Sequence, residues 1–228
     1  TKKAKSDEPN FIFFGRKLPE PKEMKVEKLQ VGQLATNCYL VWDESTFQTI
    51  IIDPGDDADY VARKIQDLNL QPQLIIATHG HFDHVLAAAE LKLAFNIPFL
   101  LHRADLPLLK RASASAKYFT RVAADPAPSA DKFLKESNLI RFGQEKLKVL
   151  ETPGHTPGGI SLFGNGVVFD GDTLFYRALG RTDFRYASKE TLLASIKNKL
   201  FKLPDETIVY PGHGPETTIG EEKQNLLK

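Results

Sequence analysis

Four side chains able to bind a metal lie within the segment 78–84, which has the sequence Thr-His-Gly-His-Phe-Asp-His. They are His79, His81, Asp83 and His84. The apolar run 74–77 before them predicts a buried strand, and residues 85–94 after them favour a helix. The four side chains therefore belong to a strand-to-helix turn, where a fixed strand and a loop allow several side chains to converge.

Imidazole nitrogen and carboxylate oxygen are ligands that suit zinc, and also iron or manganese. His79 and His81 are two residues apart, so in extended chain both point to the same side. Asp83 and His84 follow where the chain turns, so they can point toward a second position nearby. One segment can thus supply two adjacent metal ions. The alternative is a polar turn with solvated histidines, which further ligands downstream disfavour.

Three downstream segments extend the pattern: 152–158 (Thr-Pro-Gly-His-Thr-Pro-Gly), 169–173 (Phe-Asp-Gly-Asp-Thr) and 210–214 (Tyr-Pro-Gly-His-Gly). Together with His-X-His-X-Asp-His, in this order, they resemble the metallo-β-lactamase superfamily. The resemblance covers nearly the whole chain from about Met24 onward. It implies two divalent metal ions, with zinc favoured over iron or manganese. The first ion would be held by His79, His81 and His155, and the second by Asp83, His84 and His213, with Asp172 bridging the two.

The resemblance also implies an α/β fold, a four-layer α/β/β/α sandwich formed by a single domain over residues 24–228. In that fold the Asp53-Pro54-Gly55 turn lies beneath the metals and is structural. Periodicity alone predicts only mixed α and β structure. It indicates strands at 25–31, 37–42, 49–53, 97–102, 139–142, 147–150, 160–163, 167–170 and 207–210. It indicates helices at 56–68, 104–119 (in one or two pieces) and 189–200, and a last helix capped by Thr217 or Thr218.

The implied chemistry is hydrolysis of an acyl or phosphoryl bond by a metal-bound hydroxide. A divalent metal lowers the pKa of bound water from ~16 to ~7, which makes hydroxide available at neutral pH. Asp83 can bind metal through one oxygen and orient the water through the other. The sequence contains no Ser/His/Asp nucleophile set.

Segments 171–175, 179–184 and 212–222 are similar to short bacterial glyoxalase II-like enzymes, the hydroxyacylglutathione hydrolases. Those enzymes cleave the thioester S-lactoylglutathione to lactate and glutathione. The resemblance implies that Arg181 binds the glycine carboxylate of glutathione. The alternative is that Arg181 and Asp183 pair with each other and brace their loop.

Two departures weaken glutathione recognition: Pro215 stands where longer family members have a tyrosine, and the chain ends where their C-terminal helical segment begins. The main rival activity is that of the persulfide dioxygenases, which use a single iron at the equivalents of His79, His155 and Asp172. Promiscuous hydrolysis of β-lactams, lactones or phosphodiesters is a further alternative. A dedicated class B β-lactamase is disfavoured, because most of these place another ligand type at the position of Asp172.

Composition limits the partners. The 228 residues carry a net charge of +1, so no charge excess favours nucleic acid or an anionic membrane, and a small-molecule substrate is expected. No apolar stretch approaches the ~20 residues that span a bilayer. The single cysteine, Cys38, excludes an internal disulfide and fits a reducing compartment such as the cytoplasm. Cys38 itself is expected to be a buried structural thiol, and His102 to lie outside the site.

Residues 1–23 receive no function. They are interpreted as an expression leader, a trimmed targeting sequence or a family-specific extension, in which Phe11 to Phe14 could add an edge strand or pack on the body. The oligomeric state is left open by the sequence.

Overall fold

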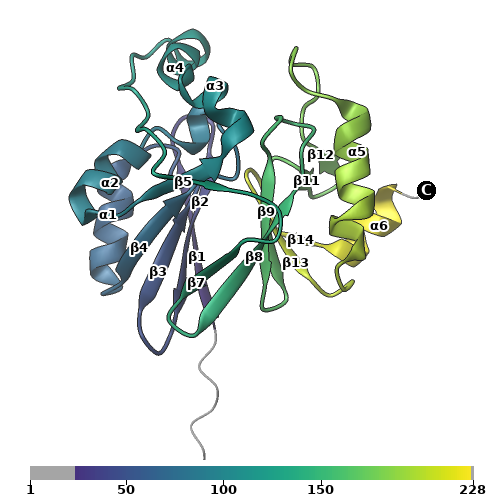
Figure 1. The fold of residues 1–228 in the computed structure, drawn as a ribbon, viewed down its shortest axis with the longest axis horizontal. Helices are drawn as coiled ribbons and strands as arrows, with labels where there is room; N and C mark the ends of the chain where they lie inside the picture. Colours follow the sequence, from purple (N-terminus) through teal and green to yellow (C-terminus); the bar gives the residue numbers. More distant parts are fainter. Residues whose placement is uncertain (1–23, 227–228) are drawn as a thin grey trace, which may run out of the picture.

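The computed structural model describes residues 24–226, so the strand or packing expected at residues 11–14 lies outside the described residues. Two six-stranded sheets form the centre of the molecule (Figure 1). The first has the order β1 (Met24–Val31), β2 (Thr36–Asp43), β3 (Gln48–Ile52), β4 (Gln71–Ile76), β5 (Phe99–His102) and β6 (Lys132–Leu134). The second has the order β14 (Thr217–Thr218), β13 (Ile208–Pro211), β10 (Val167–Gly171), β9 (Ile160–Gly164), β8 (Glu145–Glu151) and β7 (Leu139–Phe142).

Helices cover the outer face of each sheet (Figure 1). On the side of the first sheet lie α1 (Ala58–Asp67), α2 (Ala88–Phe95), α3 (Leu106–Leu109) and α4 (Ala112–Thr120). On the side of the second lie α5 (Lys189–Asn198) and α6 (Ile219–Leu226). This arrangement is the expected four-layer α/β/β/α sandwich. Every helix within residues 24–226 is too short or too polar to cross a lipid bilayer.

Strand β2 illustrates why the inner strands are apolar on both faces. Successive side chains of a strand point to opposite faces. Tyr39 and Val41 pack between the two sheets, whereas Cys38 and Leu40 pack toward the helices. All four are buried, so β2 shows no alternation of polar and apolar residues. Each fully buried aliphatic side chain contributes about 1.5–3 kcal/mol to folding, which fixes the register of the strand.

The expected helix at 85–94 begins later, at Ala88. A short 3-10 turn, η1 (Phe82–His84), occupies the preceding residues, and Val85 leaves helical geometry at φ −136°. The expected helical stretch at 104–119 is in two pieces, α3 and α4. The periodicity missed β6 and the small hairpin β11 (Leu174–Phe175) and β12 (Ala178–Leu179), which are only two or three residues long.

Parallel pairing determines where loops gather. Strands β3, β4, β5 and β6 run parallel, and so do β10 and β13. The carboxyl ends of parallel strands meet at one edge of a sheet. The loops that follow β4, β5, β10 and β13 therefore come together at one end of the sandwich.

Candidate metal centre

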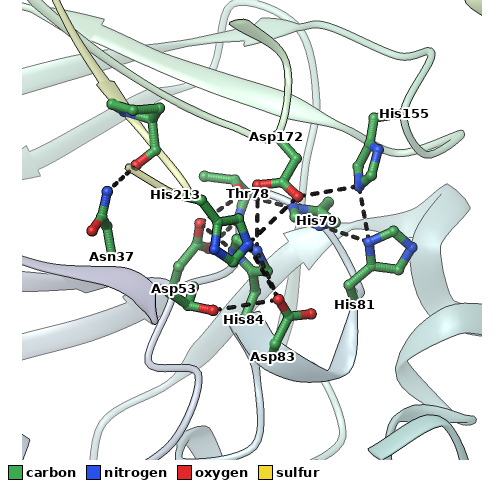
Figure 2. A network of polar contacts seen from close by, with 12 residues as sticks. Asn37, Asp53, Thr78, His79, His81, Asp83, His84, His155, Asp172 and His213 are labelled. Atoms are coloured by element: carbon green, nitrogen blue, oxygen red, sulfur yellow. Dashed lines mark hydrogen bonds and ion pairs between the residues drawn. The ribbon is translucent and has the colours of Figure 1, made fainter. Parts of the chain in front are cut away.

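The seven side chains predicted as ligands meet at this edge (Figure 2). His79 and His81 lie in the loop after β4, and Asp83 and His84 lie on η1. The other three come from the second sheet: His155 from the β8–β9 loop, Asp172 from the residue after β10, and His213 from the loop after β13. The site is thus built half by each sheet.

The first cluster contains His79, His81, His155 and Asp172, each of which offers a ligand atom within 4.8 Å of the others. His81 Nδ1 is 3.0 Å from His79 Nε2 and 2.9 Å from His155 Nε2. His155 Nε2 is 3.4 Å from an Asp172 carboxylate oxygen, Oδ2. Burial lowers the pKa of His79 well below its usual value and that of His81 to about 3, so both rings are neutral and offer lone pairs.

The second cluster contains Asp83, His84 and His213. Asp83 Oδ2 is 3.3 Å from His213 Nε2 and 3.7 Å from His84 Nε2. Burial alone would lower the pKa of His84, but the carboxylates of Asp172, Asp83 and Asp53 raise it to about 10. Without metal, the His84 ring therefore carries a proton at neutral pH, surrounded by these carboxylates.

Two buried atoms without hydrogen-bond partners in the described part of the chain are suited to bind a metal ion. His84 Nε2 and Asp172 Oδ1, which are 3.5 Å apart, have no hydrogen-bond partner among the described residues. Leaving a buried polar atom without a partner costs free energy. A cation bound between the clusters would satisfy both atoms and offset the carboxylate charge. The residues present thus fit divalent cations.

Asp53 holds ligands of both clusters from below. Its Oδ1 accepts a hydrogen bond from Thr78 N (2.6 Å), and its Oδ2 accepts from the Thr78 hydroxyl (2.6 Å) and from His84 Nδ1 (3.0 Å). The Thr78 hydroxyl in turn lies 3.1 Å from His79 Nδ1. This network turns the Nε2 atoms of His79 and His84 toward the clusters. It gives Asp53 the supporting place that the sequence predicted.

Arg181 forms the loop brace that was the alternative for this residue. Its guanidinium makes two hydrogen bonds to the Asp183 carboxylate, at 3.0 and 2.7 Å. Both side chains are about two-thirds exposed, so the pair adds little to stability. The backbone carbonyl of Arg181 accepts from His155 Nδ1 at 2.8 Å, which orients that ring.

Asp105, which was not predicted from the sequence, ties two ligand loops together. Its carboxylate accepts hydrogen bonds from Gly80 N (2.9 Å), Thr156 Oγ1 (2.7 Å) and Gly158 N (2.6 Å). The loops of His81 and His155 are therefore fixed to one fully buried side chain. The available signal was its place shortly after a strand, at the edge where the ligands gather.

Asn37 was also missed, and it fixes the loop of His213. Its side-chain amide donates to the carbonyls of Pro211 (2.9 Å) and Gly214 (3.0 Å). The Tyr39 hydroxyl donates to the same Pro211 carbonyl at 2.7 Å. Because Asn37 and Tyr39 belong to the first sheet, these bonds hold the two halves of the site together.

Two residues lie away from the clusters, as expected. Burial raises the pKa of the Cys38 thiol, which is fully enclosed. His102 is 3.3 Å from Glu151 and belongs to neither cluster.

A cleft of about 680 Å³ opens above the two clusters. Apolar side chains form much of its wall: Leu34, Pro107, Leu108, Phe119, Pro157, Phe175 and Phe184. Arg111, Arg181 and Tyr186 are its other prominent lining groups. Its size is that of a site for a small molecule.

Comparison with known proteins agrees with this geometry. Residues 31–213 match the metallo-beta-lactamase superfamily. A protein of Haemophilus influenzae named hydroxyacylglutathione hydrolase GloC is 36% identical over 205 residues, which are 89% of this chain and 96% of that protein. The crystal structure of TTHA1623 in a di-iron-bound form is 39% identical with a TM-score of 0.81, and covers 88% of this chain and 98% of the other. The crystal structure of the BLEG-1 B3 metallo-beta-lactamase is 36% identical with a TM-score of 0.82, over 88% and 97% of the two chains. The chain therefore belongs to the metallo-β-lactamase superfamily of metal-binding hydrolases.

Proposed function

We propose that this protein hydrolyses a thioester such as S-lactoylglutathione, using two divalent cations, with zinc favoured. The observation that carries the proposal is the position of Asp172. Its Oδ2 is 3.4 Å from His155 of the first cluster, and its Oδ1 is 3.5 Å from His84 of the second. A carboxylate shared in this way suits two adjacent cations. The 36% identity to a protein named hydroxyacylglutathione hydrolase supports the thioester as substrate.

Two such cations would supply a water that ionises near pH ~7 and would polarise the acyl oxygen. Asp83 is suited to orient that water. Burial would raise the pKa of its carboxyl, but His84 and His213 lower it well below its usual value, so the group is a carboxylate. One oxygen, Oδ2, faces His213 and also accepts from the Thr36 hydroxyl at 3.3 Å. The other oxygen is available to accept the proton of the water and pass it to the leaving thiolate.

The cleft above the clusters supports recognition of an anionic substrate. Arg181 is already paired with Asp183, whereas Arg111 forms no ion pair with a carboxylate of the described residues. Arg111 lies between α3 and α4 on the wall of the cleft. We therefore propose that Arg111 binds the carboxylate on the thiol portion of the substrate, in place of Arg181, to which the sequence resemblance assigned it.

Comparing Arg111→Gln with Arg181→Gln tests this assignment. A charge-assisted hydrogen bond contributes about 1.5–3 kcal/mol, so loss of the Arg111 contact should raise KM about ten- to hundredfold with a smaller change in kcat. Arg181→Gln should change KM less, because its charge is already matched by Asp183. The reverse order of effects would assign the carboxylate to Arg181.

The activity itself is tested with zinc-loaded protein and S-D-lactoylglutathione, followed through the loss of thioester absorbance with and without a chelator. Rapid, chelator-sensitive turnover is expected. No turnover by protein that carries two bound metal ions would exclude glutathione thioesters of this kind and direct attention to lactones, β-lactams and phosphodiesters.

A mono-iron persulfide dioxygenase is the second candidate, because the first cluster offers a complete ligand set without the second. Oxygen uptake by iron-loaded protein with glutathione persulfide measures this activity. The variant His213→Ala separates the two functions. It should remove thioester hydrolysis, which needs both clusters, and should leave a mono-iron oxygenase active.

A further inference from the structure

Tyr186 contacts the outward side of a candidate metal ligand. Its Oη is 2.7 Å from His81 Nε2. The other ring nitrogen of His81, Nδ1, turns toward His79 and His155, at 3.0 and 2.9 Å (Figure 2). The two nitrogens of His81 therefore face different partners: Nδ1 faces the first cluster and Nε2 faces the tyrosine.

This orientation fixes where the ring proton must be. A neutral imidazole has one N–H and one lone pair. For Nδ1 to bind a cation, Nδ1 must carry the lone pair, and the ring proton must be on Nε2. Tyr186 Oη is placed to accept that proton, and a hydroxyl that accepts it directs its own proton elsewhere. The tyrosine thus selects the tautomer of His81 that can bind metal.

Two other histidines of the site are held at the nitrogen that faces away from the clusters. His84 is held by Asp53, which is 1% exposed, and His155 is held by a backbone carbonyl. Tyr186 is 40% exposed and lines the cleft. Arg181 also lines the cleft, but it holds His155 through its backbone carbonyl. Tyr186 is therefore the one of these three partners that holds its histidine through a side chain on the wall of the cleft.

An aromatic stack positions the tyrosine. The rings of Phe184 and Tyr186 are 5.5 Å apart and nearly parallel, at 11°. Phe184 also contacts the His81 ring, at 5.3 Å between centroids. The Arg181 guanidinium lies 4.7 Å from the centre of the Phe184 ring, and Asp183 fixes that guanidinium. The brace between Arg181 and Asp183 therefore supports the stack that presents the hydroxyl to His81.

We propose that Tyr186 is a positioning residue of the first cluster, whose hydroxyl holds His81 in the tautomer and orientation that bind a cation. The inference rests on the proposed assignment of His79, His81 and His155 to one ion. It does not depend on the identity of the substrate.

The variant Tyr186→Phe removes the hydroxyl and keeps the ring stack with Phe184. Loss of a group that orients a metal-binding histidine typically weakens metal binding about 10–100-fold. We expect a loss of this size for one of two zinc ions, measured by competition with a chromophoric chelator, and an unchanged affinity for the other. In the cobalt-loaded protein, the visible absorption of one of the two ions should change. Urea unfolding of the metal-free variant should match that of the unsubstituted protein.

Tyr176→Phe is the matched control. Tyr176 is also 40% exposed, and its ring lies 5.1 Å from the Arg177 guanidinium on the turn of the β11–β12 hairpin. This variant should bind both ions as the unsubstituted protein does.

Two results are distinguishable. If Tyr186→Phe binds both zinc ions with unchanged affinity and an unchanged cobalt spectrum, the role of Tyr186 is refuted while the metal centre stands. If the unsubstituted protein binds no metal ion, the proposed metal centre is itself refuted, and this inference with it.

Discussion

The substitution Asp53→Asn should disturb both metal sites at once, although Asp53 is not among their predicted ligands. Asp53 is 1% exposed, and its carboxylate accepts three hydrogen bonds. Asparagine has nearly the same shape, but one of its two terminal groups is a donor. The backbone N–H of Thr78 can only donate, so the amide oxygen must remain at Oδ1. The new NH₂ group then takes the place of Oδ2.

The NH₂ group would face two atoms that now donate to Asp53, which are His84 Nδ1 and the Thr78 hydroxyl oxygen. His84 can accept at Nδ1 only if its proton moves to Nε2, the atom that faces Asp83 and Asp172. The Thr78 hydroxyl can turn and donate to His79 Nδ1, 3.1 Å away, which moves the proton of that ring to Nε2 as well. In each ring the proton then occupies Nε2, so that nitrogen no longer has a lone pair with which to bind a metal.

The expected magnitude follows from these contacts. Loss of the group that orients a metal-binding histidine costs about 10–100-fold in affinity, and here it applies to one histidine in each cluster. Two hydrogen bonds to a charged group are also lost, each of which contributes about 1.5–3 kcal/mol. The metal-free protein should therefore unfold at a lower urea concentration, and both zinc ions should bind more weakly.

Isothermal titration calorimetry with zinc, together with chelator competition, measures both affinities. Asp131→Asn is the control. The Asp131 carboxylate also accepts from a backbone N–H, that of Phe99 at 2.7 Å, and pairs with Lys92, but it belongs to neither cluster. It should leave metal binding unchanged. Binding of both ions by Asp53→Asn with unchanged affinity would refute the argument from the tautomers.

Three further predictions concern proton release, backbone packing and the thiol. His84, with a pKa raised to about 10, holds a proton in the metal-free protein at neutral pH, and the pKa of His213 is also raised by Asp83 and Asp172. Metal binding at the second cluster should therefore release protons and strengthen as pH rises toward about 10. Calorimetry in two buffers of different ionisation enthalpy measures the number of protons released, and a release of none would contradict the raised pKa of His84. A Cβ at Gly55 would overlap the carbonyl oxygen of Asp83, so Gly55→Ala should lower the free energy of unfolding by about 1–3 kcal/mol and weaken metal binding, and unchanged urea unfolding would argue against this close packing. Cys38 is fully buried with a raised pKa, so a thiol reagent should modify it only after unfolding, whereas rapid labelling of the native protein would contradict its enclosure.

The fold was predictable where the sequence pattern is long. Strands such as β2 and β4 were identified because continuous apolar runs of this length are typical of buried strands, and the helix α1 because its apolar residues recur with the period of a helix. The hairpin β11–β12 and strand β6 were missed, because two or three residues are too few to show a period. The start of α2 was placed too early, since residues 85–87 have helix-favouring composition but are held by the turn η1.

The partners of the ligands were harder to predict than the candidate ligands themselves. Asp105, Asn37 and Tyr186 carry no motif in the sequence, and each is 25 or more residues away from the group that it holds. Such contacts depend on how the two sheets pack, which no local pattern reports. The choice between substrate contact and loop brace for Arg181 likewise depended on where the Asp183 side chain lies.

The sequence by itself determined the types of the seven candidate ligands and the place of most of them next to strands, because histidine and aspartate chemistry and strand periodicity are local properties. The tertiary structure alone decided which atoms of those side chains face one another. Parallel pairing brings the carboxyl ends of β4 and β10 to one edge, and packing of the two sheets brings His155, Asp172 and His213 against the 79–84 segment. Buried partners such as Asp53 then determine which of the two nitrogens of an imidazole carries the proton and which can bind metal. This depends on hydrogen bonds between residues far apart in the chain.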